Sequence, residues 1–296
     1  MTEAAVTEAA VAEAAVRPRR ARSKAAWRGM GRWVVILLGL PFALFPVYWM
    51  ITSAFKSSPE LLGLRPTLYP HEPSLDQFRE ALADGTLLAS IVNSAVVGLS
   101  ASVVVLVVGS GAAYAATHWK FPGVGGVMKL TLFTQLLPGA ATCVPIYLLW
   151  SKLGIVQSLG GLGLLYSILN LPVAVWMLIG FFRSMPYELT EAALVDGASR
   201  PRILWSIILP VARPSLVAVG VYTLIGCWGE FFFATIFLSR NARTSTVALA
   251  AMIGQHDPNI GPLMAASVIM SAVPLVFFFA MQRQFVSGLT SGAVKT

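Results

Sequence analysis

Two sets of carboxylates stand out in an otherwise apolar chain. In a polar island, Glu191 and Asp196 flank Ala192 and Ala193, whereas Glu230 stands alone inside a long apolar run. A carboxylate in the first turn of a short helix can make a charge-assisted contact with a cationic side chain of another protein. A carboxylate inside a membrane-spanning segment marks a candidate ion or solute site. The first set therefore predicts a docking element, and the second predicts a place on a transport path.

Motifs typical of enzymes and metal sites are missing from the sequence. It contains no Gly-x-x-x-x-Gly-Lys-Ser/Thr loop for a nucleoside triphosphate, no His-Glu-x-x-His and no Gly-x-Ser-x-Gly. His71, His118 and His256 fall in three separate loops, and Cys143 and Cys227 lie inside apolar runs. This placement argues against a metal site or a disulfide framework. We expect a chain that is not an enzyme, does not hydrolyse ATP by itself and carries no cofactor.

The polar island predicts a short helix. Pro186 suits the first helical position, where its missing N–H costs nothing, and Glu188 and Glu191 fall in the first turns, where the helix dipole favours anions. Gly197 can adopt the left-handed conformation that ends a helix, which gives a length of about three turns. Small alanines flanked by carboxylates would form a short rod that another protein can approach closely.

A second helix is expected directly after the first. Ser199 can cap it, and Pro201 lies near its first position. We expect this helix to stop before Leu209-Pro210, because a proline disfavours the helical conformation of the residue before it. An ordinary loop helix would be the simpler interpretation of a lone Glu-Ala-Ala, but the spacing and the flanking apolar segments favour a docking element.

The composition is that of a membrane protein. Hydrophobic residues make up 56% of the 296 residues and charged residues only 11%, against about 25% charged residues in soluble domains. The formal charge of +8 does not indicate a nucleic-acid-binding protein, because the basic residues form no aromatic-basic motif and follow the membrane topology instead.

Six apolar segments are long enough to cross a bilayer. The third contains Gln135, Pro138 and Pro145 and is expected to be kinked. Gln135 and, in the fourth segment, Asn170 are weaker candidates for the transport path and favour interhelical hydrogen bonds. The predicted fold class is therefore an all-α membrane protein with six transmembrane helices, at about residues 31–55, 88–116, 127–153, 164–182, 214–238 and 262–286.

Basic residues are distributed unevenly across this topology. Fifteen lie on the side shared by both termini and six on the other side. Loops rich in Lys and Arg stay in the cytoplasm. We therefore expect both termini and the polar loop at about residues 184–213 to be cytoplasmic, in a multi-pass membrane protein.

The two ends of the chain fall outside the predicted membrane domain, which we place at residues 31–287. Residues 1–30 combine a five-residue Glu-Ala-Ala-Val repeat with a basic run, and they predict a low-complexity cytoplasmic tail. A partner-binding arm is the alternative for this segment. Residues 288–296 are expected to form a second cytoplasmic tail, which either frays or reaches toward a partner subunit.

Together these motifs resemble those of the inner-membrane subunits of binding-protein-dependent ABC importers. The signature loop of that family reads Glu-Ala-Ala, then Asp-Gly-Ala, then an apolar-x-Leu-Pro ending, and residues 191–193, 196–198 and 207–210 match it. The resemblance also covers Asn93-Ser94 and the C-terminal residues 288–295. It therefore extends over all but about the first thirty residues of the chain. The sequence is most similar to a carbohydrate-uptake permease, such as the second membrane subunit of maltose-type transporters.

The resemblance implies a type I ABC importer permease fold and a set of partners. The polar loop would act as a coupling helix seated in a groove of an ATPase subunit, and ATP and Mg²⁺ would be bound by that subunit. Glu191 would contact a basic ATPase residue, Asp196 would cap or orient the turn, and Gly197 would permit the exit. The further partners implied are a second, different permease subunit, a second ATPase subunit, an extracytoplasmic sugar-binding protein and a carbohydrate substrate.

Glu230 follows Trp228-Gly229, where this family usually has Trp-Asn-Glu or Trp-Asn-Asp. The departure at Gly229 weakens any assignment of the substrate by analogy. Our hypothesis is that Glu230 faces the translocation path, with Trp228 and Tyr222 able to stack on a sugar ring. The alternative is a carboxylate near the membrane edge that is paired or hydrated.

Other classes of function remain open at the level of sequence. A proton-coupled secondary transporter would use Glu230 as its ionisable group, although inverted repeats are not evident and the polar loop would have no role. A non-transporting membrane scaffold is another class. Within the ABC class, the alternative is a solute other than a sugar, such as a glycerol phosphate.

Overall fold

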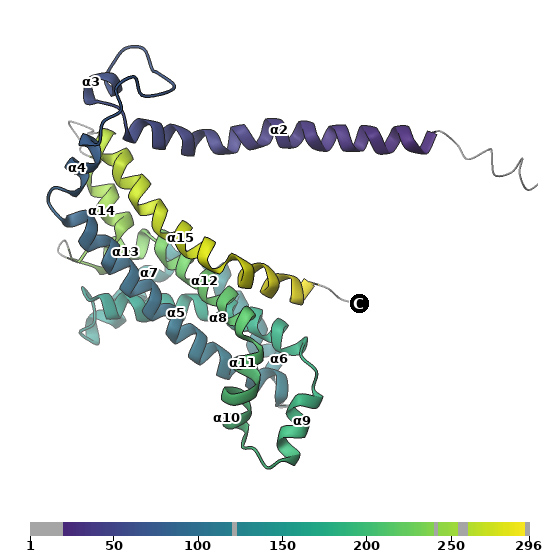
Figure 1. The fold of residues 1–296 in the computed structure, drawn as a ribbon. Helices are drawn as coiled ribbons and strands as arrows, with labels where there is room; N and C mark the ends of the chain where they lie inside the picture. Colours follow the sequence, from purple (N-terminus) through teal and green to yellow (C-terminus); the bar gives the residue numbers. More distant parts are fainter. Residues whose placement is uncertain (1–19, 120–122, 240–241, 254–259, 294–296) are drawn as a thin grey trace, which may run out of the picture. The chain divides into compact units, whose positions relative to one another are not determined.

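The computed structural model describes residues 20–119, 123–239, 242–253 and 260–293, and these ranges are helical and contain no strands (Figure 1). The repeat at residues 2–16, His256 and residues 294–296 lie outside the described residues. The chain divides into two compact units, the first ending at Thr52 and the second beginning at Ser53.

The described part of the first unit lies within one long helix, α2 (Arg20–Ala54), whose last two residues belong to the second unit. Its portion Ile36–Ala54 is apolar and long enough to cross a bilayer. A lipid-exposed segment has no water to satisfy its backbone, so it must make its hydrogen bonds internally, as a helix does. The helix α2 continues through Pro41 and Pro46. The first predicted span is therefore confirmed as a helix.

The second unit is organised by long helices that pack along one another. The helix α5 packs along α8, and α12 packs against both α5 and α15 (Figure 1). Small residues permit the close approach: a methyl group at Gly163 of α8 would lie 2.8 Å from Ser100 Oγ of α5. In a lipid bilayer the hydrophobic effect does not bring helices together, so close packing of this kind stabilises their association. These helices are α5 (Thr86–His118), α8 (Leu159–Arg183), α12 (Arg213–Gly229) and α15 (Ile260–Ala293).

Two pairs of consecutive helices bend sharply at a short break. The third predicted span consists of α6 (Val124–Phe133) with the short η1 (Thr134–Leu136), followed by α7 (Gly139–Lys152) at an angle of 104°. Pro138 sits at the break in an extended conformation, so the predicted kink is confirmed. The second bend, of 83°, separates residues 200–211 from α12.

The described helices fit the predicted number of spans. Four of them are long and apolar enough to cross a membrane, and the number rises to six if each bent pair is one span. One predicted boundary is wrong: the fifth span is not continuous through residue 238. Instead α12 ends at Gly229, Glu230 is extended, and α13 (Phe232–Phe237) starts afresh.

Apart from the helices of the polar loop, three short helices lie between the described spans. One of them, α4, buries Gln77 and Ala81. Before it, Glu60 accepts hydrogen bonds from Thr67 and His71, and these bonds lower the pKa of Glu60. The short helices are α3 (Ser58–Leu61), α4 (Asp76–Leu82) and α14 (Ser245–Ala251).

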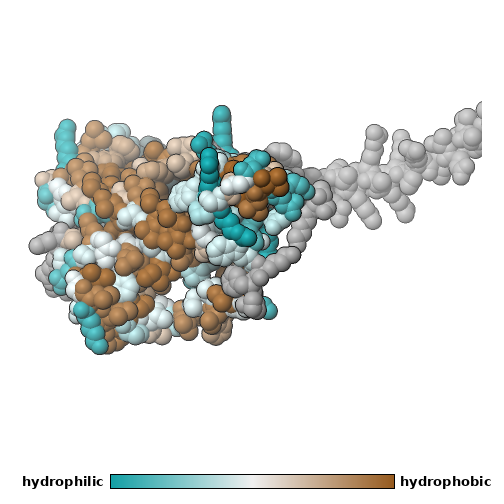
Figure 2. Space-filling view, turned by 90° about the horizontal axis from the view of Figure 1, so that it is seen from below, coloured by the Kyte–Doolittle hydropathy of each residue, from teal (hydrophilic) through white to brown (hydrophobic). Residues whose placement is uncertain are grey.

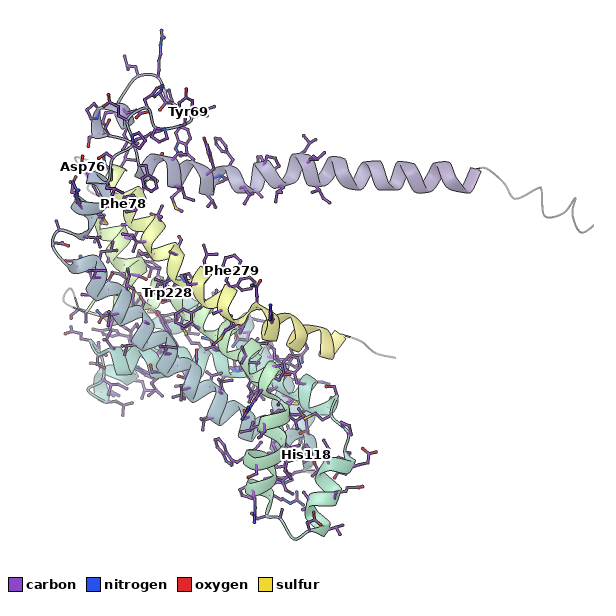
Figure 3. All side chains as sticks on the ribbon, in the orientation of Figure 1. Tyr69, Asp76, Phe78, His118, Trp228 and Phe279 are labelled. Atoms are coloured by element: carbon purple, nitrogen blue, oxygen red, sulfur yellow. The ribbon has the colours of Figure 1, made fainter. Side chains whose placement is uncertain are left out.

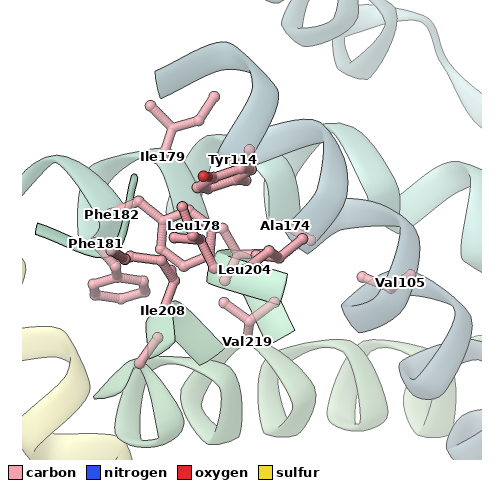
Figure 4. Packing of buried hydrophobic residues seen from close by; sticks show 14 residues of the cluster. Val105, Tyr114, Ala174, Leu178, Ile179, Phe181, Phe182, Leu204, Ile208 and Val219 are labelled. Atoms are coloured by element: carbon pink, nitrogen blue, oxygen red, sulfur yellow. The ribbon is translucent and has the colours of Figure 1, made fainter. Parts of the chain in front are cut away.

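The largest buried cluster joins the membrane helices to the polar loop. It includes Tyr114 of α5, Leu178 and Phe182 of α8, and Ile208 of the loop (Figure 4). In Figure 2, hydrophobic residues cover broad areas of the surface between hydrophilic ones, as expected when lipid replaces water around a protein. Cys143 and Cys227 are free and buried.

Candidate functional site

The polar island forms a short helix, α9 (Glu188–Val195), with eight residues. This is about two turns, one fewer than predicted, because the helix begins two residues after Pro186 instead of at it. Gly197 has a φ of +78°, which confirms the left-handed C-cap. The N–H groups of Gly197 and Ala198 donate to the carbonyls of Leu194 and Ala193 at 3.1 and 3.0 Å, the paired bonds of a Schellman motif.

The two faces of α9 differ sharply. Thr190 and Ala193, three residues apart, are buried with exposed fractions of 3% and 6%. Glu191 and Ala192 are exposed, and Val195 has 87% of its surface exposed. One face therefore fixes α9 to the membrane helices, while the other presents a carboxylate beside small and apolar side chains.

The second helix of the loop differs from the prediction. It starts as expected after Ser199, as α10 (Arg200–Ile203), but it does not stop before Leu209-Pro210. It widens into a π-helical turn, η2 (Leu204–Ile208), and continues as α11 (Leu209–Val211). A proline collides with the carbonyl four residues before it in an α-helix, and the wider π turn relieves that collision.

Buried side chains hold this loop against the membrane helices. Ala193 of α9 and Ile203 of α10 belong to the same apolar cluster as Phe181 and Phe182 of α8 and Val219 of α12. Figure 4 shows the phenylalanines close to Ile208 and Leu204 of the loop. Interiors packed in this way transmit displacement, so the loop is suited to move together with the helices that it contacts.

Glu230 has hydrogen-bond donors on both carboxylate oxygens. The N–H of Phe233 donates to Oε1 at 3.0 Å and the N–H of Ala234 donates to Oε2 at 3.1 Å. The hydroxyl of Tyr166 in α8 donates to Oε2, and Thr246 Oγ1 in α14 donates to the backbone carbonyl of Glu230 at 2.8 Å. The residue thus caps α13 and ties α8, α12, α13 and α14 together.

Tyr166 is a site residue that the sequence reasoning missed. It is 1% exposed and lies 64 positions before Glu230 in the chain. A tyrosine inside an apolar run carries a hydroxyl that needs a partner. The need of this hydroxyl for a partner could have indicated Tyr166 as a site residue. Only the fold shows that the partner is Glu230.

The two aromatic candidates of α12 do not lie on one face. Trp228 is 7% exposed and Tyr222 is 41% exposed, and six residues of helix separate them by about 120° around the axis. Figure 3 shows Trp228 among the helices of the second unit. The two rings therefore leave α12 in different directions, and Tyr222 is the exposed one of the pair.

The two amide candidates contact neighbouring backbone. Gln135 Nε2 donates to the carbonyl of Leu169 in α8 at 3.0 Å. Asn170 Nδ2 donates to the carbonyl of Tyr166 one turn earlier at 2.9 Å and lies 3.9 Å from Cys227 Sγ. Gln135 makes the interhelical hydrogen bond that was expected, whereas Asn170 bonds mainly within its own helix.

Asn93 and Ser94 anchor α14. Asn93 Nδ2 donates to the carbonyl of Arg243 at 3.0 Å, and Ser94 Oγ accepts from the N–H of Ser245 at 2.8 Å. The first N–H groups of a helix need such acceptors. Beside α14 lies a hollow of about 310 Å³, whose lining includes Phe231, Thr235, Ser239 and Arg243.

Comparison with known proteins identifies the family. The family described as "Binding-protein-dependent transport system inner membrane component" matches residues 105–291, which include the polar loop and Glu230. The chain belongs to this family. The resemblance expected from the signature loop is confirmed, and the chain is a multi-pass membrane protein of the ABC importer permease kind.

Individual relatives agree with this assignment. The trehalose/maltose transport system permease protein MalG of Thermococcus litoralis is 35% identical over 85% of this chain and 91% of its own length. The diacetylchitobiose uptake system permease protein DasC of Streptomyces coelicolor is 31% identical over 88% of this chain and 94% of its own. A chain from the crystal structure of a bacterial importer of the acidic polysaccharide alginate matches with a TM-score of 0.75, 20% identity and coverage of 90% and 98%. The fold is that of a type I ABC importer permease.

Proposed function

We propose that this ABC permease is one of two different permease subunits of an ATP-driven sugar importer and forms half of its translocation path. Relatives named for trehalose, maltose and diacetylchitobiose transport support a mono- or oligosaccharide as the solute. The complete transporter would add two ATPase subunits and an extracytoplasmic sugar-binding protein, with no role for nucleic acid.

The observation that carries this proposal is the exposed face of α9. Glu191 is positioned to make a charge-assisted contact with a basic ATPase residue, while Leu194 and Val195 beside it are exposed apolar side chains. Asp196 and Gly197 end the helix at a fixed place. The sequence has no phosphate-binding loop, so ATP and Mg²⁺ belong to the partner subunits.

The distribution of basic residues supports the orientation. With fifteen of them on the side of the termini and of α9, both termini and α9 face the cytoplasm, where ATPase subunits reside. In this arrangement the loop from α3 to α4 and the helix α14 face the sugar-binding protein.

The transport path is the part of the proposal that depends most on Glu230. Because its carboxylate holds Tyr166 and the start of α13, we assign it a place in the wall of the path, where it fixes the helices. Of the two aromatic candidates for stacking on a sugar, Tyr222 is exposed and Trp228 is buried. Gln135 holds η1 against α8, and Asn170 lies between α8 and Cys227 of α12.

Reversing the charge of Glu191 tests the proposal. The variant Glu191→Lys should lower both capture of the ATPase subunits and vanadate-sensitive sugar uptake about tenfold or more, because a charge-assisted contact would become repulsive. Glu72→Lys, the same change on an exposed carboxylate before α4, is the control for capture and should leave capture of the ATPase subunits unchanged. Normal ATPase activity and uptake in Glu191→Lys would show that α9 is not the coupling element.

A further inference from the structure

His118 ends α5 and lies against the coupling helix α9. Its Nε2 is 3.2 Å from Thr190 Oγ1, on the buried face of α9, and its Nδ1 is 2.8 Å from Thr117 Oγ1. Its ring stacks between Tyr114, with centroids 4.4 Å apart, and Tyr187, with centroids 5.8 Å apart. Figure 3 shows His118 at the end of the second unit where α9 lies. The sequence had placed this residue in a turn.

The direction of each hydrogen bond follows from the donors available. Thr117 Oγ1 can donate its one hydrogen to the carbonyl of Ala113 at 2.9 Å or of Tyr114 at 3.1 Å. When it does so it accepts from His118, whose neutral imidazole then carries its hydrogen on Nδ1 and accepts from Thr190 on Nε2. When it donates to Nδ1 instead, Nε2 carries the hydrogen and donates to Thr190. In either tautomer, one hydrogen bond joins His118 of α5 to the buried Thr190 of α9.

The second helix of the loop is attached to the next residue of α5. The guanidinium of Arg200, the first residue of α10, lies 5.7 Å from the centroid of the Trp119 ring, within the range of a cation–π contact. Consecutive residues at the end of α5 thus hold the two helices of the loop, His118 holding α9 and Trp119 holding α10.

The other end of α5 contacts an element on the opposite side of the predicted membrane. Asn93 and Ser94 hold the start of α14 through the bonds to Arg243 and Ser245. The helix between Ser94 and His118 is unbroken, and 24 residues of α-helix span about 36 Å. A displacement of the loop that is passed to His118 would therefore reach α14 along one rigid helix.

We propose that His118 is a positioning residue for energy coupling: it joins α9 to α5, so that movement of the coupling loop displaces the helix that runs to α14. This inference rests on the proposed ATP-driven function. A residue that only stabilised the fold would affect yield and melting temperature, whereas a residue that transmits movement sets how much solute is carried per ATP hydrolysed.

The test uses the complete transporter, with permeases, ATPase subunits and binding protein, in liposomes. The variant His118→Phe keeps a stacking ring but removes both nitrogens, and Thr190→Val removes the hydroxyl at nearly constant volume. Each should lower the amount of sugar transported per ATP about two- to tenfold, the range for one net hydrogen bond, while the melting temperature falls by only a few degrees. Thr190→Ser, which keeps the hydroxyl, is the matched control and should retain the wild-type ratio.

The double variant His118→Phe/Thr190→Val should be no worse than either single variant, because both remove the same bond. A wild-type ratio of sugar to ATP in both single variants, or losses that multiply in the double variant, would overturn the role of His118. The role of His118 would also be overturned if the ratio of sugar to ATP fell only in proportion to the loss of melting temperature. A wild-type transporter without ATP-dependent uptake would instead contradict the proposed function itself.

Discussion

At the scale of single residues, Glu230 connects the end of one helix to the start of the next. The first N–H groups of a helix have no partners within it, and α13 has only six residues, too few to be stable alone. The Glu230 carboxylate accepts from two of these N–H groups and from Tyr166. The position therefore requires an acceptor with two oxygens.

Removing that acceptor should destabilise the region. Glu230→Ala leaves two N–H groups and the Tyr166 hydroxyl without their partner, at a cost of about 1–3 kcal/mol for each buried group. We expect a lower melting temperature of the purified complex and reduced transport. Glu230→Gln keeps one acceptor oxygen and should lie between Glu230→Ala and the wild type in both measurements.

Tyr166→Phe provides the control, since it deletes a single donor and leaves the cap of α13 intact. It should lower the melting temperature less than Glu230→Ala does. If Glu230→Ala melted at the wild-type temperature, the assignment of Glu230 as the cap of α13 would have to be abandoned.

The sequence predicted single residues well where local geometry decides their role. Gly197 was predicted as a left-handed cap because only a few neighbours determine that conformation. Gln135 was predicted as an interhelical donor because an amide in an apolar run needs an acceptor. Tyr166 and His118 were not predicted as partners of Glu230 and Thr190, because those contacts join segments 64 and 72 residues apart.

At the scale of elements, the coupling loop depends on the turn between α9 and α10. Gly197 lies in the left-handed region at φ +78°, which costs about 1–2 kcal/mol for a residue with a Cβ. The turn aligns α9 and α10 so that their buried residues enter the same apolar cluster. A strained turn would therefore loosen the attachment of α9.

Gly197→Ala should reduce ATP-dependent transport severalfold and expose the α9–α10 turn to proteolysis in inside-out membrane vesicles. Gly197→Asn should be tolerated better, because asparagine adopts the left-handed conformation more readily. The control is Gly111→Ala in the middle of α5, where an added methyl group meets no described atom outside its own helix within 4 Å. Equal resistance to proteolysis in all three variants would show that the turn tolerates a side chain.

Packing between α5 and α8 makes a separate prediction. An added methyl group at Gly163 would approach Ser100 Oγ to 2.8 Å, and overpacking of this kind costs about 1–3 kcal/mol. Gly163→Ala should therefore lower the melting temperature of the detergent-solubilised complex. Gly160→Ala, three residues earlier, meets no described atom within 4 Å and should not. The reverse order of the two melting temperatures would contradict this packing of α5 on α8.

The elements themselves could be predicted because an apolar segment of sufficient length has few alternatives in a membrane. The bend near Pro138 was also predictable, since it follows from a local feature of the chain. The ends of two helices could not be predicted. The second helix of the loop passes through Pro210 by widening into a π turn, and α12 stops at Gly229 because Glu230 finds partners in other helices.

At the scale of the whole molecule, one long helix connects the two proposed sites of action. It carries His118 and Trp119 near the coupling loop and Asn93 and Ser94 beside α14. In the proposed transporter the other permease, the ATPase subunits and the binding protein are separate chains that meet this helix at its two ends.

The most direct test of the account is to ask what touches α9 in the assembled transporter. Val195 is 87% exposed, and Cys143 and Cys227 are buried, so V195C offers an accessible thiol for a benzophenone maleimide. On illumination it should crosslink to an ATPase subunit, whereas L64C, in the loop between α3 and α4, should not. The account would be contradicted if V195C formed no crosslink to a co-purifying ATPase, or if it reacted only with reagents applied outside the cell.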